Sequence, residues 1–595
     1  MEDKKTMPPV LRRILKNNAA VDQLNHNKGP LPMVSYMEEA MVLAESWIEH
    51  PRSILVVKEN LYHAQRLYER LATLLPESAC ALFSADESLR VEAIAVSPEM
   101  RANQIETLSS LLEKPDQIVV TSPSGFLRLL PTPETFRDAC IHLKAGDTCD
   151  MEELKRKLRA GGYFQASHID QPLSFASRGG IVDVYSINYE NPVRIEFFGD
   201  EIDSIRYFSA DTQSTIAPLQ EVRIVPASSF LLNDAQVKEI LTRARAMLED
   251  KKEVIQSGSI ENDLEMIEEG MRDQRLYPYS AFLSSPAGIW DYLDHPQIVY
   301  SDVSRIETNA KHLLDESVAY IQEMVEEEKL LPKFSVWHEL SRAAQGCSSI
   351  EEDPYAENTS NLEPVHLPNE PLSVKLRILL NGSTVVFALN EKEENRLRDQ
   401  CKEDEIILYE TDGTKDLVEG SFNILHDPLA EGIHDPVHDI TIVTSEELFE
   451  IHHHSGRYER KFRSAEVIHS FEDLEPGDYV VHSQYGVGQY MGIVTREIQG
   501  TKRDFLHIIY RGNGELYVPL EQFRLVRKFV SSAGVVPRLN KLGTNEWEKT
   551  KKRLEENVNQ VADRLVNLYA VRTEHIGHAF QKDSPLQTQF ENNFE

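Results

Sequence analysis

The sequence has little cysteine and no long hydrophobic run. Its five cysteines are scattered over 595 residues, and no two of them form a Cys-x-x-Cys pair. This pattern favours a reducing cytoplasm over a disulfide framework and lacks the usual spacing of zinc ligands. No apolar stretch reaches the ~18 residues of a membrane span, and the first residues lack the apolar core of a signal peptide. We therefore predict a cytoplasmic chain with no membrane segment, no disulfide and no metal site.

The sequence also lacks the motifs of nucleotide-dependent and hydrolytic enzymes. The string Gly-x-x-x-x-Gly-Lys-Ser/Thr, whose amides and lysine cradle phosphates, does not occur. His338-Glu339 lacks the second histidine of a zinc protease motif, and the run His452-His453-His454 lies in a polar connector. We find no catalytic, metal-binding or cofactor-binding constellation, and we predict that this chain is not an enzyme.

Positive charge is in short supply as well. The 63 Lys and Arg residues face 97 Asp and Glu residues, which gives a net charge of −34. Because neutralising phosphates requires basic side chains, this balance argues against a broad nucleic-acid footprint and favours protein partners. At this length several domains are expected, and 41% hydrophobic residues fit a soluble globular chain.

The patterns that are present predict a series of α/β domains. Residues 34–140 contain two short buried-type strands, SILVV and QIVVTS, between amphipathic helical stretches, which indicates a parallel sheet. Residues 227–345 are mainly helical in pattern. Residues 346–366 are acidic and poor in apolar residues, as a linker would be, and residues 367–456 alternate again as a small α/β domain.

Residues 142–226 predict a helix with a Gly-Gly stop, followed by three strands. The pair Gly199-Asp200 joins VRIEFF to EIDSIRYF as a tight hairpin. Arg194 and Phe198 are four residues apart on one strand, so they share a face, and an exposed arginine beside an aromatic side chain suits protein docking. The alternative is that one of the two adjacent phenylalanines fills the core and that the arginines are solvated.

Residues 473–531 predict a small β-barrel of the SH3 or Tudor type. Gly477, Gly486 and Gly488 supply tight turns, and an Asn-Gly pair at Asn513 separates two alternating runs, FLHIIY and ELYVPL. Such a module usually binds a partner. Farther along, an apolar stripe predicts one long helix from residue 545.

Two parts of the chain resemble a known family. The phrases SRGGIVDV and RIEFFGDEIDSIR resemble domain 2 of UvrB and the corresponding domain of the bacterial transcription-repair coupling factors, which docks UvrA. The phrases PGDYVVHSQYGVGQYMGI and GELYVPLEQF resemble that family's CarD-like RNA polymerase-interacting domain. The string NKLG, followed by Trp547 and a helix, is similar to the family's link into a DNA translocase. The resemblance covers most of the chain from about residue 40 onward.

The resemblance implies a multidomain α/β and α+β architecture. A UvrB-like, degenerate RecA-type α/β domain would carry an inserted β-hairpin domain, followed by a small α/β domain, an SH3/Tudor-like β-barrel and a C-terminal linker helix. In chain order, the predicted parts are 1–141 (first half of the UvrB-like domain), 142–226 (UvrA-interacting domain 2), 227–345 (second half), 346–366 (acidic linker), 367–456 (small α/β domain), 457–472 (linker), 473–531 (CarD-like domain) and 540–595 (linker helix).

Two partners follow from the resemblance, UvrA and the β subunit of RNA polymerase. The positions that correspond to UvrA contacts are Arg178, Arg194, Phe198 and Arg206. The positions that correspond to polymerase contacts are Leu516, Tyr517, Val518, Pro519, Tyr485, Val487 and Arg511. Of these, Leu516 is the preferred single contact, on a strand edge that would pair with a strand of the polymerase. The alternative is that Leu516 and Val518 face the barrel core.

The resemblance also places the nucleotide chemistry elsewhere. Residues 26–43 stand where UvrB has its P-loop, but Gly29 is followed by Pro30 and Pro32, and proline has no amide donor. No cofactor is therefore expected in this chain, and ATP, Mg and most DNA contacts are expected in a motor that the chain lacks. Two other hypotheses are a standalone CarD-like transcription regulator and an active helicase or nuclease. The UvrA-type positions argue against the first, and the missing P-loop argues against the second.

Overall fold

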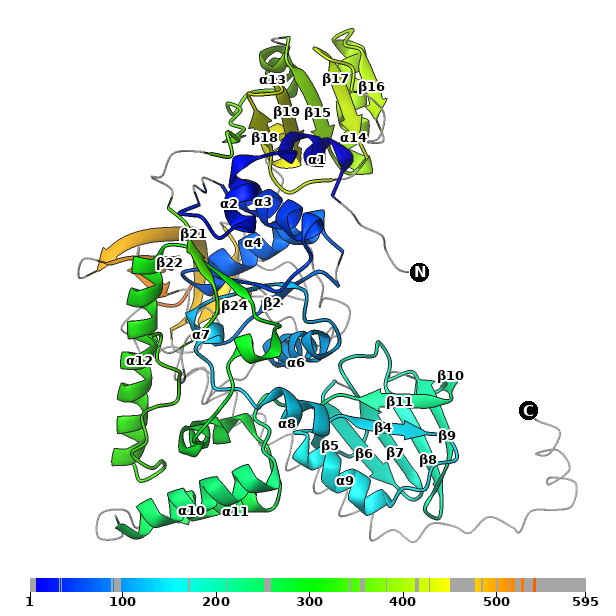
Figure 1. Cartoon of the computed structure of the whole chain (residues 1–595), viewed down its shortest axis with the longest axis vertical. Helices are drawn as coiled ribbons and strands as arrows, with labels where there is room; N and C mark the ends of the chain where they lie inside the picture. The colour runs from blue at the N-terminus through cyan, green and yellow to red at the C-terminus, as the bar shows by residue number, and fades with distance from the viewer. Residues whose placement is uncertain are drawn as a thin grey trace, which may run out of the picture. The chain divides into compact units, whose positions relative to one another are not determined.

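The computed structural model describes most of residues 7–449 and 477–541. The larger gaps are 90–97, 251–257, 354–358, 412–416, 520–525 and 529–538. The chain divides into two compact units, Met1–Ala465 and Glu466–Glu595, which are described separately (Figure 1). The helix predicted from residue 545 and the turn residue Asn513 lie outside the described residues.

A parallel sheet forms the centre of the first unit. Its strands, in spatial order, are β13 (Ser349–Glu351), β12 (Gln297–Tyr300), β1 (Ile54–Val57), β3 (Ile118–Thr121) and β2 (Cys80–Phe83). All four pairings are parallel, as the sequence predicted, and β1 and β3 are buried along their whole length. The helices of this region are α3 (Tyr36–Glu49), α4 (Leu61–Leu74), α6 (Pro98–Glu113), α7 (Pro123–Phe126), α8 (Pro133–Asp138) and α12 (Val303–Glu326).

This sheet takes strands from both sides of an inserted lobe, whose strands are mostly antiparallel. β1, β2 and β3 precede that lobe in the chain, whereas β12 and β13 follow it. The segment 346–366, expected to be a linker, contains β13, so part of it belongs to the sheet. Between the lobe and β12 lie α10 (Asp234–Asp250), α11 (Gly258–Glu268) and two 3-10 helices, η1 (Gln274–Phe282) and η2 (Ile289–Tyr292).

The insert lobe, residues 141–224, consists of one large sheet, a short strand pair and a helix. The elements are β4 (Ile141–Lys144), α9 (Met151–Ala160), β5 (Phe164–Ala166), β6 (Ser174–Arg178), β7 (Ile181–Tyr185), β8 (Val193–Phe198), β9 (Glu201–Phe208), β10 (Thr215–Leu219) and β11 (Glu221–Ile224). Strands β10 to β5 form the sheet in that order, and β4 pairs with β11 (cyan to teal in Figure 1). Phe175, Val182 and Ile195 belong to the main hydrophobic core, so one face of the sheet is buried.

The small α/β domain follows, with helices on a six-stranded sheet. Its elements are β14 (Glu363–Pro364), α13 (Leu372–Leu379), β15 (Thr384–Ala388), α14 (Glu391–Glu403), β16 (Leu408–Thr411), β17 (Phe422–Leu425), β18 (Ile433–Asp435), β19 (Ile440–Thr444) and α15 (Ser445–Phe449). One face shares a core with α13, α14 and α15. Apolar residues of the other face, including Val386 and Ile442, join Leu11 and Val21 of the N-terminal helices α1 (Pro9–Leu15) and α2 (Ala19–Asn25) in one core. The first residues of the chain therefore help to hold this domain.

The second unit contains five antiparallel strands. They are β20 (Tyr479–His482), β21 (Gly486–Ile498), β22 (Thr501–Tyr510), β23 (Gly514–Pro519) and β24 (Val526–Lys528), in the spatial order β23-β22-β21-β20-β24. The predicted hairpin between FLHIIY and ELYVPL is confirmed, because Tyr510 pairs with Gly514 and Phe505 with Pro519. Among the described strands β23 and β24 are the two edges, and closure into a barrel stays a prediction.

Candidate protein-docking sites

A two-residue turn between β6 and β7 fixes the position of Arg178. Arg178 pairs with Ile181, so Gly179 and Gly180 alone make the turn. Gly179 has a φ of +56°, a conformation that glycine adopts at little cost. A Cβ on Gly180 would lie 2.9 Å from the carbonyl oxygen of Phe197, so this turn is pressed against the end of β8. The string SRGG therefore forms a close-packed turn, and the exposed Arg178 lies directly before its two glycines.

The hairpin between β8 and β9 presents Phe198 beside this turn. Phe198 pairs with Glu201 across a turn in which Gly199 has a φ of +67°. The side chain of Phe198 is exposed, with 82% of the residue's surface accessible. A hydrogen bond stabilises the tip of the hairpin, because the Cys149 N–H donates to the Asp200 carbonyl at 2.7 Å. An exposed phenylalanine on a braced tip matches the docking interpretation and excludes the alternative in which Phe198 fills the core.

The strand register places all four predicted UvrA-contacting residues on one face of the sheet, here called the docking face. Arg194 lies directly opposite Arg206, and Phe198 follows Arg194 by four residues on β8. Arg178 reaches the same face because its partner Ile181 lies opposite Glu196, which separates Arg194 from Phe198 on the strand. The alternation of side chains along strands therefore gathers these residues from three hairpin-connected strands.

Arg194 differs from the expectation of an exposed arginine, because only 7% of its surface is accessible. Its guanidinium makes two hydrogen bonds to the buried carboxylate of Asp183, at 2.7 and 2.8 Å, and lies 4.4 Å from the ring centre of Phe208. The bond to Asp183 raises the pKa of Arg194 above its ordinary value. Arg194 is thus held within the sheet and offers little surface to a partner. Its contacts hold Asp183 and Phe208 in place.

Arg206 is held by a second ion pair on the same face. Its guanidinium donates to both carboxylate oxygens of Glu196, at 2.5 and 2.6 Å. The hydrogen bond from Arg206 lowers the pKa of Glu196 below its usual range. No comparable partner of Arg178 occurs in the part of the chain that the structure describes, so its charge is available to another protein.

The sequence analysis missed Ile181 as a member of the docking face. Ile181 is half-buried and lies in one cross-strand row with Arg178 and Glu196. The signal was present in the strand IVDVY, because Val182 and Val184 point into the core and so force Ile181 and Asp183 to the opposite face. Ile181 adds an apolar surface between the arginine and the hairpin tip.

The predicted polymerase-contacting residues of β23 divide between the two faces of its sheet. Val518 is buried opposite Leu506, and Leu516 is half-buried opposite Ile508, so both point inward, as the alternative interpretation had it. Pro519 ends the strand. Tyr517 points the other way.

Tyr517 is part of a stack on the outer face. Its ring lies parallel to that of His507, with centres 4.7 Å apart, and the Arg496 guanidinium lies 3.5 Å from its ring centre. Tyr517 is thus the outward-facing, ordered side chain of an edge strand. Of the other three predicted residues, Val487 and Arg511 are joined by hydrogen bonds to Asn540. Tyr485 lies two residues before Val487, with its ring centre 4.8 Å from that of His482.

Comparison with known proteins identifies two domains in the chain. A model of the UvrB interaction domain matches residues 141–230, and a model of the CarD-like/TRCF RID domain matches residues 474–530. A transcription-repair-coupling factor of Bacillus subtilis is 31% identical over 92% of the chain and 49% of its own length. Proteins of the same name from Staphylococcus haemolyticus and Staphylococcus aureus are 28% and 27% identical, over 99% and 98% of the chain.

The chain belongs to the transcription-repair coupling factor family. It spans about half the length of the curated relatives that it matches. The two matched regions contain the docking face and the strands β20 to β24, respectively. No helix among the described residues is long and apolar enough to cross a membrane.

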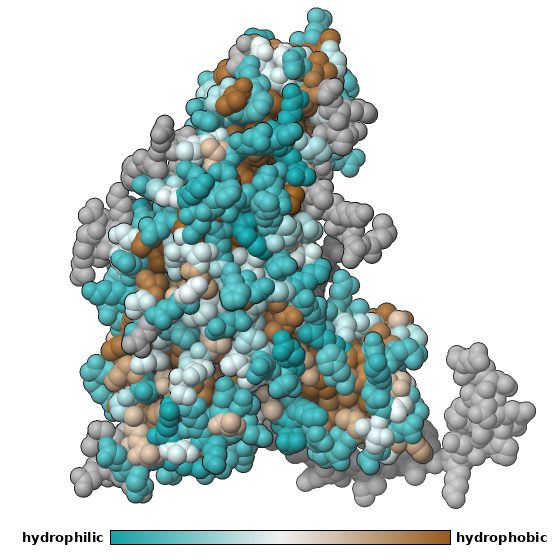
Figure 2. Space-filling view, viewed as in Figure 1, coloured by the Kyte–Doolittle hydropathy of each residue, from teal (hydrophilic) through white to brown (hydrophobic). Residues whose placement is uncertain are grey.

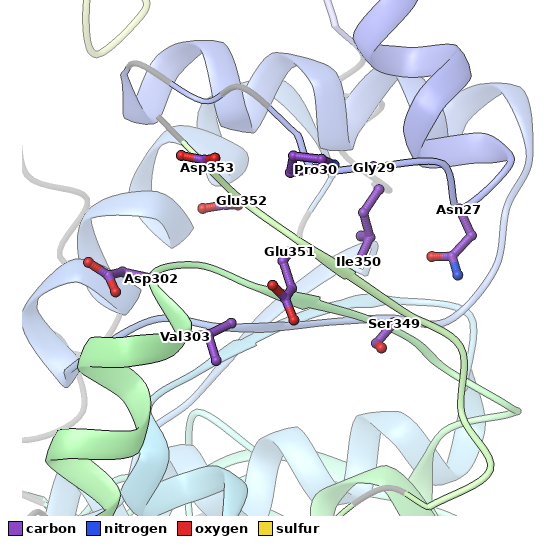
Figure 3. A pocket seen from close by; sticks show the side chains of 10 residues that line it. All are labelled: Asn27, Gly29, Pro30, Asp302, Val303, Ser349, Ile350, Glu351, Glu352 and Asp353. Carbon is purple, nitrogen blue, oxygen red and sulfur yellow. The ribbon is translucent and has the colours of Figure 1, made fainter. Parts of the chain in front are cut away.

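A pocket of about 570 Å³ lies at the carboxyl ends of β12 and β13, where α/β folds commonly bind ligands. Its lining includes Gly29 and Pro30, together with the carboxylates of Asp302, Glu351 and Glu352 (Figure 3). Neither Lys nor Arg is among the lining residues. Because like charges repel, this lining is unfavourable for a phosphate group.

The neighbouring start of α3 is closed by the protein's own carboxylates. Glu38 forms a capping box with Ser35, and Glu39 in the first turn accepts a hydrogen bond from Lys58 at 2.8 Å. Lys58, which follows β1, also bonds Glu352 at 3.2 Å. These buried acids occupy the helix end that an anion would otherwise use. Through these bonds Lys58 links the start of α3 to Glu352, which lines the pocket.

Replacing Lys58 tests this buried ion cluster. In a Lys58→Met variant, Glu39 and Glu352 would be buried without their cation, and the free energy of unfolding should fall by about 3 kcal/mol. Burial and Glu352 already raise the pKa of Glu39. A carboxyl with a raised folded-state pKa stabilises the fold at low pH, and this contribution is lost as the pH rises. Denaturant titrations should therefore show a larger deficit at pH 8 than at pH 5.

The matched control is Lys28→Met, which removes a lysine that is 67% exposed in its side chain. Its effect should stay below about 0.5 kcal/mol at both pH values. An equal deficit of Lys58→Met at the two pH values would contradict the raised pKa of Glu39.

Proposed function

We propose that the chain is an adaptor for transcription-coupled nucleotide excision repair. Its insert lobe binds UvrA, and its β20–β24 sheet binds RNA polymerase at the β subunit. The support comes from the family, from the two matched domain models and, above all, from the exposed pair Arg178 and Phe198 on rigid turns. ATP hydrolysis, Mg binding and most DNA contacts belong in this account to a motor outside the chain.

The docking face suggests a partner surface with an apolar pocket and a carboxylate. Phe198 would fill the pocket, and Arg178 would pair with the carboxylate, because an aromatic and an arginine are frequent anchors of interfaces. Figure 2 shows apolar patches on the lobe that holds β5 to β10, among polar surface. The buried Arg194 would act as a positioning residue, and Asp183 would keep it in place.

The edge strand β23 suggests how the polymerase is bound. A strand of the polymerase would add to β23 through main-chain hydrogen bonds, and the outward Tyr517 would contact its side chains. Leu516, the preferred contact from the sequence, is half-buried and would support this edge from inside. A standalone CarD-like regulator remains the alternative function, but it would leave the exposed Phe198 without a role.

UvrA binding by variants of Phe198 and Arg178 tests the docking face. Phe198→Ala should raise the dissociation constant for UvrA about 30-fold and Arg178→Ala about tenfold, measured by calorimetry, because both remove an exposed anchor. The control is Phe164→Ala, which removes a phenylalanine that is 67% exposed on the edge strand β5. The control should bind UvrA like the wild type. If Phe198→Ala and Arg178→Ala also do so, the docking face is not the UvrA site.

The second prediction concerns RNA polymerase. Tyr517→Ala should weaken binding to the polymerase about tenfold in a surface-immobilised assay, because it removes the stacked, outward-facing ring of β23. Met491→Ala removes a 44% exposed side chain of β21 and should leave the affinity unchanged. UvrA binding should be the same in both variants. Loss of polymerase binding in Met491→Ala, with Tyr517→Ala unaffected, would place the contact elsewhere.

A further inference from the structure

Asn540, the first residue of the NKLG string, makes three hydrogen bonds to the end of the β20–β24 sheet. Its backbone N–H donates to the carbonyl oxygen of Val487 at 2.9 Å, and its side-chain oxygen accepts from the Val487 N–H at 2.7 Å. Its own carbonyl accepts from the Arg511 N–H at 2.9 Å. A single residue, distant in the sequence, thus joins the start of β21 to the end of β22.

These bonds form at the start of β21, where the strand is no longer paired with β22. The pairing of β21 with β22 ends at Gln489 and Ile509, and Val487 lies opposite Val481 on the other side. Both backbone groups of Val487 bond Asn540, so Asn540 replaces the missing neighbour of β21. The asparagine amide imitates a peptide carbonyl at this point, a role that its short side chain also has in turns.

The layer beneath Asn540 is closely packed. Tyr510 is 1% exposed, and its hydroxyl donates to the Gly486 carbonyl at 3.3 Å. A Cβ on Gly488 would lie 2.5 Å from Ile508 and 3.0 Å from Tyr510, so the chain needs glycine there. Above this rigid layer, Tyr485 is 41% exposed, and Val487 and Arg511 are half-buried. Asn540 therefore sets the backbone of a surface that rests on a fixed base.

We propose that Asn540 is a positioning residue of the polymerase-docking unit. It holds Val487 and Arg511 in the geometry that a partner meets, and it fastens residues 539–541 to that same end of the sheet. The docking part of this inference rests on the proposed function, whereas the fastening part rests on the three hydrogen bonds alone. Partner binding and the attachment of residues 539–541 are coupled, because both favour the same positions of Val487 and Arg511.

Amide hydrogen exchange of the whole chain, read at single residues, tests the fastening directly. In Asn540→Ala the Val487 N–H loses its acceptor, and its exchange should accelerate about tenfold relative to the wild type. Asn540→Asp keeps an acceptor oxygen and should exchange within about threefold of the wild type. Unchanged exchange at Val487 in Asn540→Ala would overturn the proposal.

The matched control is Gln489→Ala. Gln489 also uses its side-chain amide to bond a backbone carbonyl, that of Gly477 at 3.0 Å, and this bond involves neither Val487 nor Arg511. This variant should exchange normally at both of those amides. Accelerated exchange there would show a general loosening of the sheet and would overturn a specific role for Asn540.

Affinity for RNA polymerase separates positioning from mere stability. Asn540→Ala should bind the polymerase about fivefold more weakly, whereas Asn540→Asp and Gln489→Ala should bind like the wild type, and UvrA binding should not change in any of them. Normal polymerase binding by Asn540→Ala, despite faster exchange, would overturn the positioning role. A wild-type chain that does not bind polymerase would refute docking and positioning together, while the exchange at Val487 would still decide the fastening.

Discussion

The cross-strand register of β6, β7, β8 and β9 determines what the insert lobe presents to another protein. Arg178 and Phe198 are separated in the sequence, yet two tight turns bring them to the same end of one face of the sheet. Gly180 makes this possible because no side chain intervenes between its turn and the backbone of Phe197. A shift by one residue would turn Arg178, Arg194 and Phe198 into the core and destroy the surface.

Buried charge has two different uses in this chain. In the insert lobe, the pair of Asp183 and Arg194 stiffens the sheet behind the exposed anchors, so that little side-chain freedom is lost on binding. In the parallel-sheet domain, Lys58 with Glu39 and Glu352 closes the region where a related fold would accept phosphate. The first cluster supports the proposed docking surface, and the second joins the start of α3 to the lining of the pocket.

Much of this architecture could be predicted from the sequence, because local patterns encode it. The Gly199-Asp200 hairpin, the parallel strands β1 and β3 and the FLHIIY–ELYVPL hairpin follow from turn residues and alternation, and the structure contains them. Alternation along the strand predicted that Phe198 shares a face with Arg194. It could not show whether that face was buried or exposed.

Other features depend on contacts that no local pattern reveals. Arg194 is buried because Asp183 lies opposite it on a neighbouring strand, a pairing that only the register shows. Strand β13 has three residues within an acidic segment, so its place at the sheet edge comes from β12 rather than from its own composition. The side chain of Asn540 accepts a hydrogen bond from the backbone N–H of Val487, 53 positions away in the chain, and a contact with a backbone atom leaves no signal in the sequence.

In the proposed adaptor, one copy of the chain binds UvrA and RNA polymerase through separate surfaces. Sedimentation velocity of the chain with both partners, at concentrations above either dissociation constant, measures this most directly. The account predicts a single complex that contains all three proteins, which Phe198→Ala reduces to chain plus polymerase and Tyr517→Ala reduces to chain plus UvrA. Two separate binary complexes that exclude each other, with no species containing all three proteins, would contradict it.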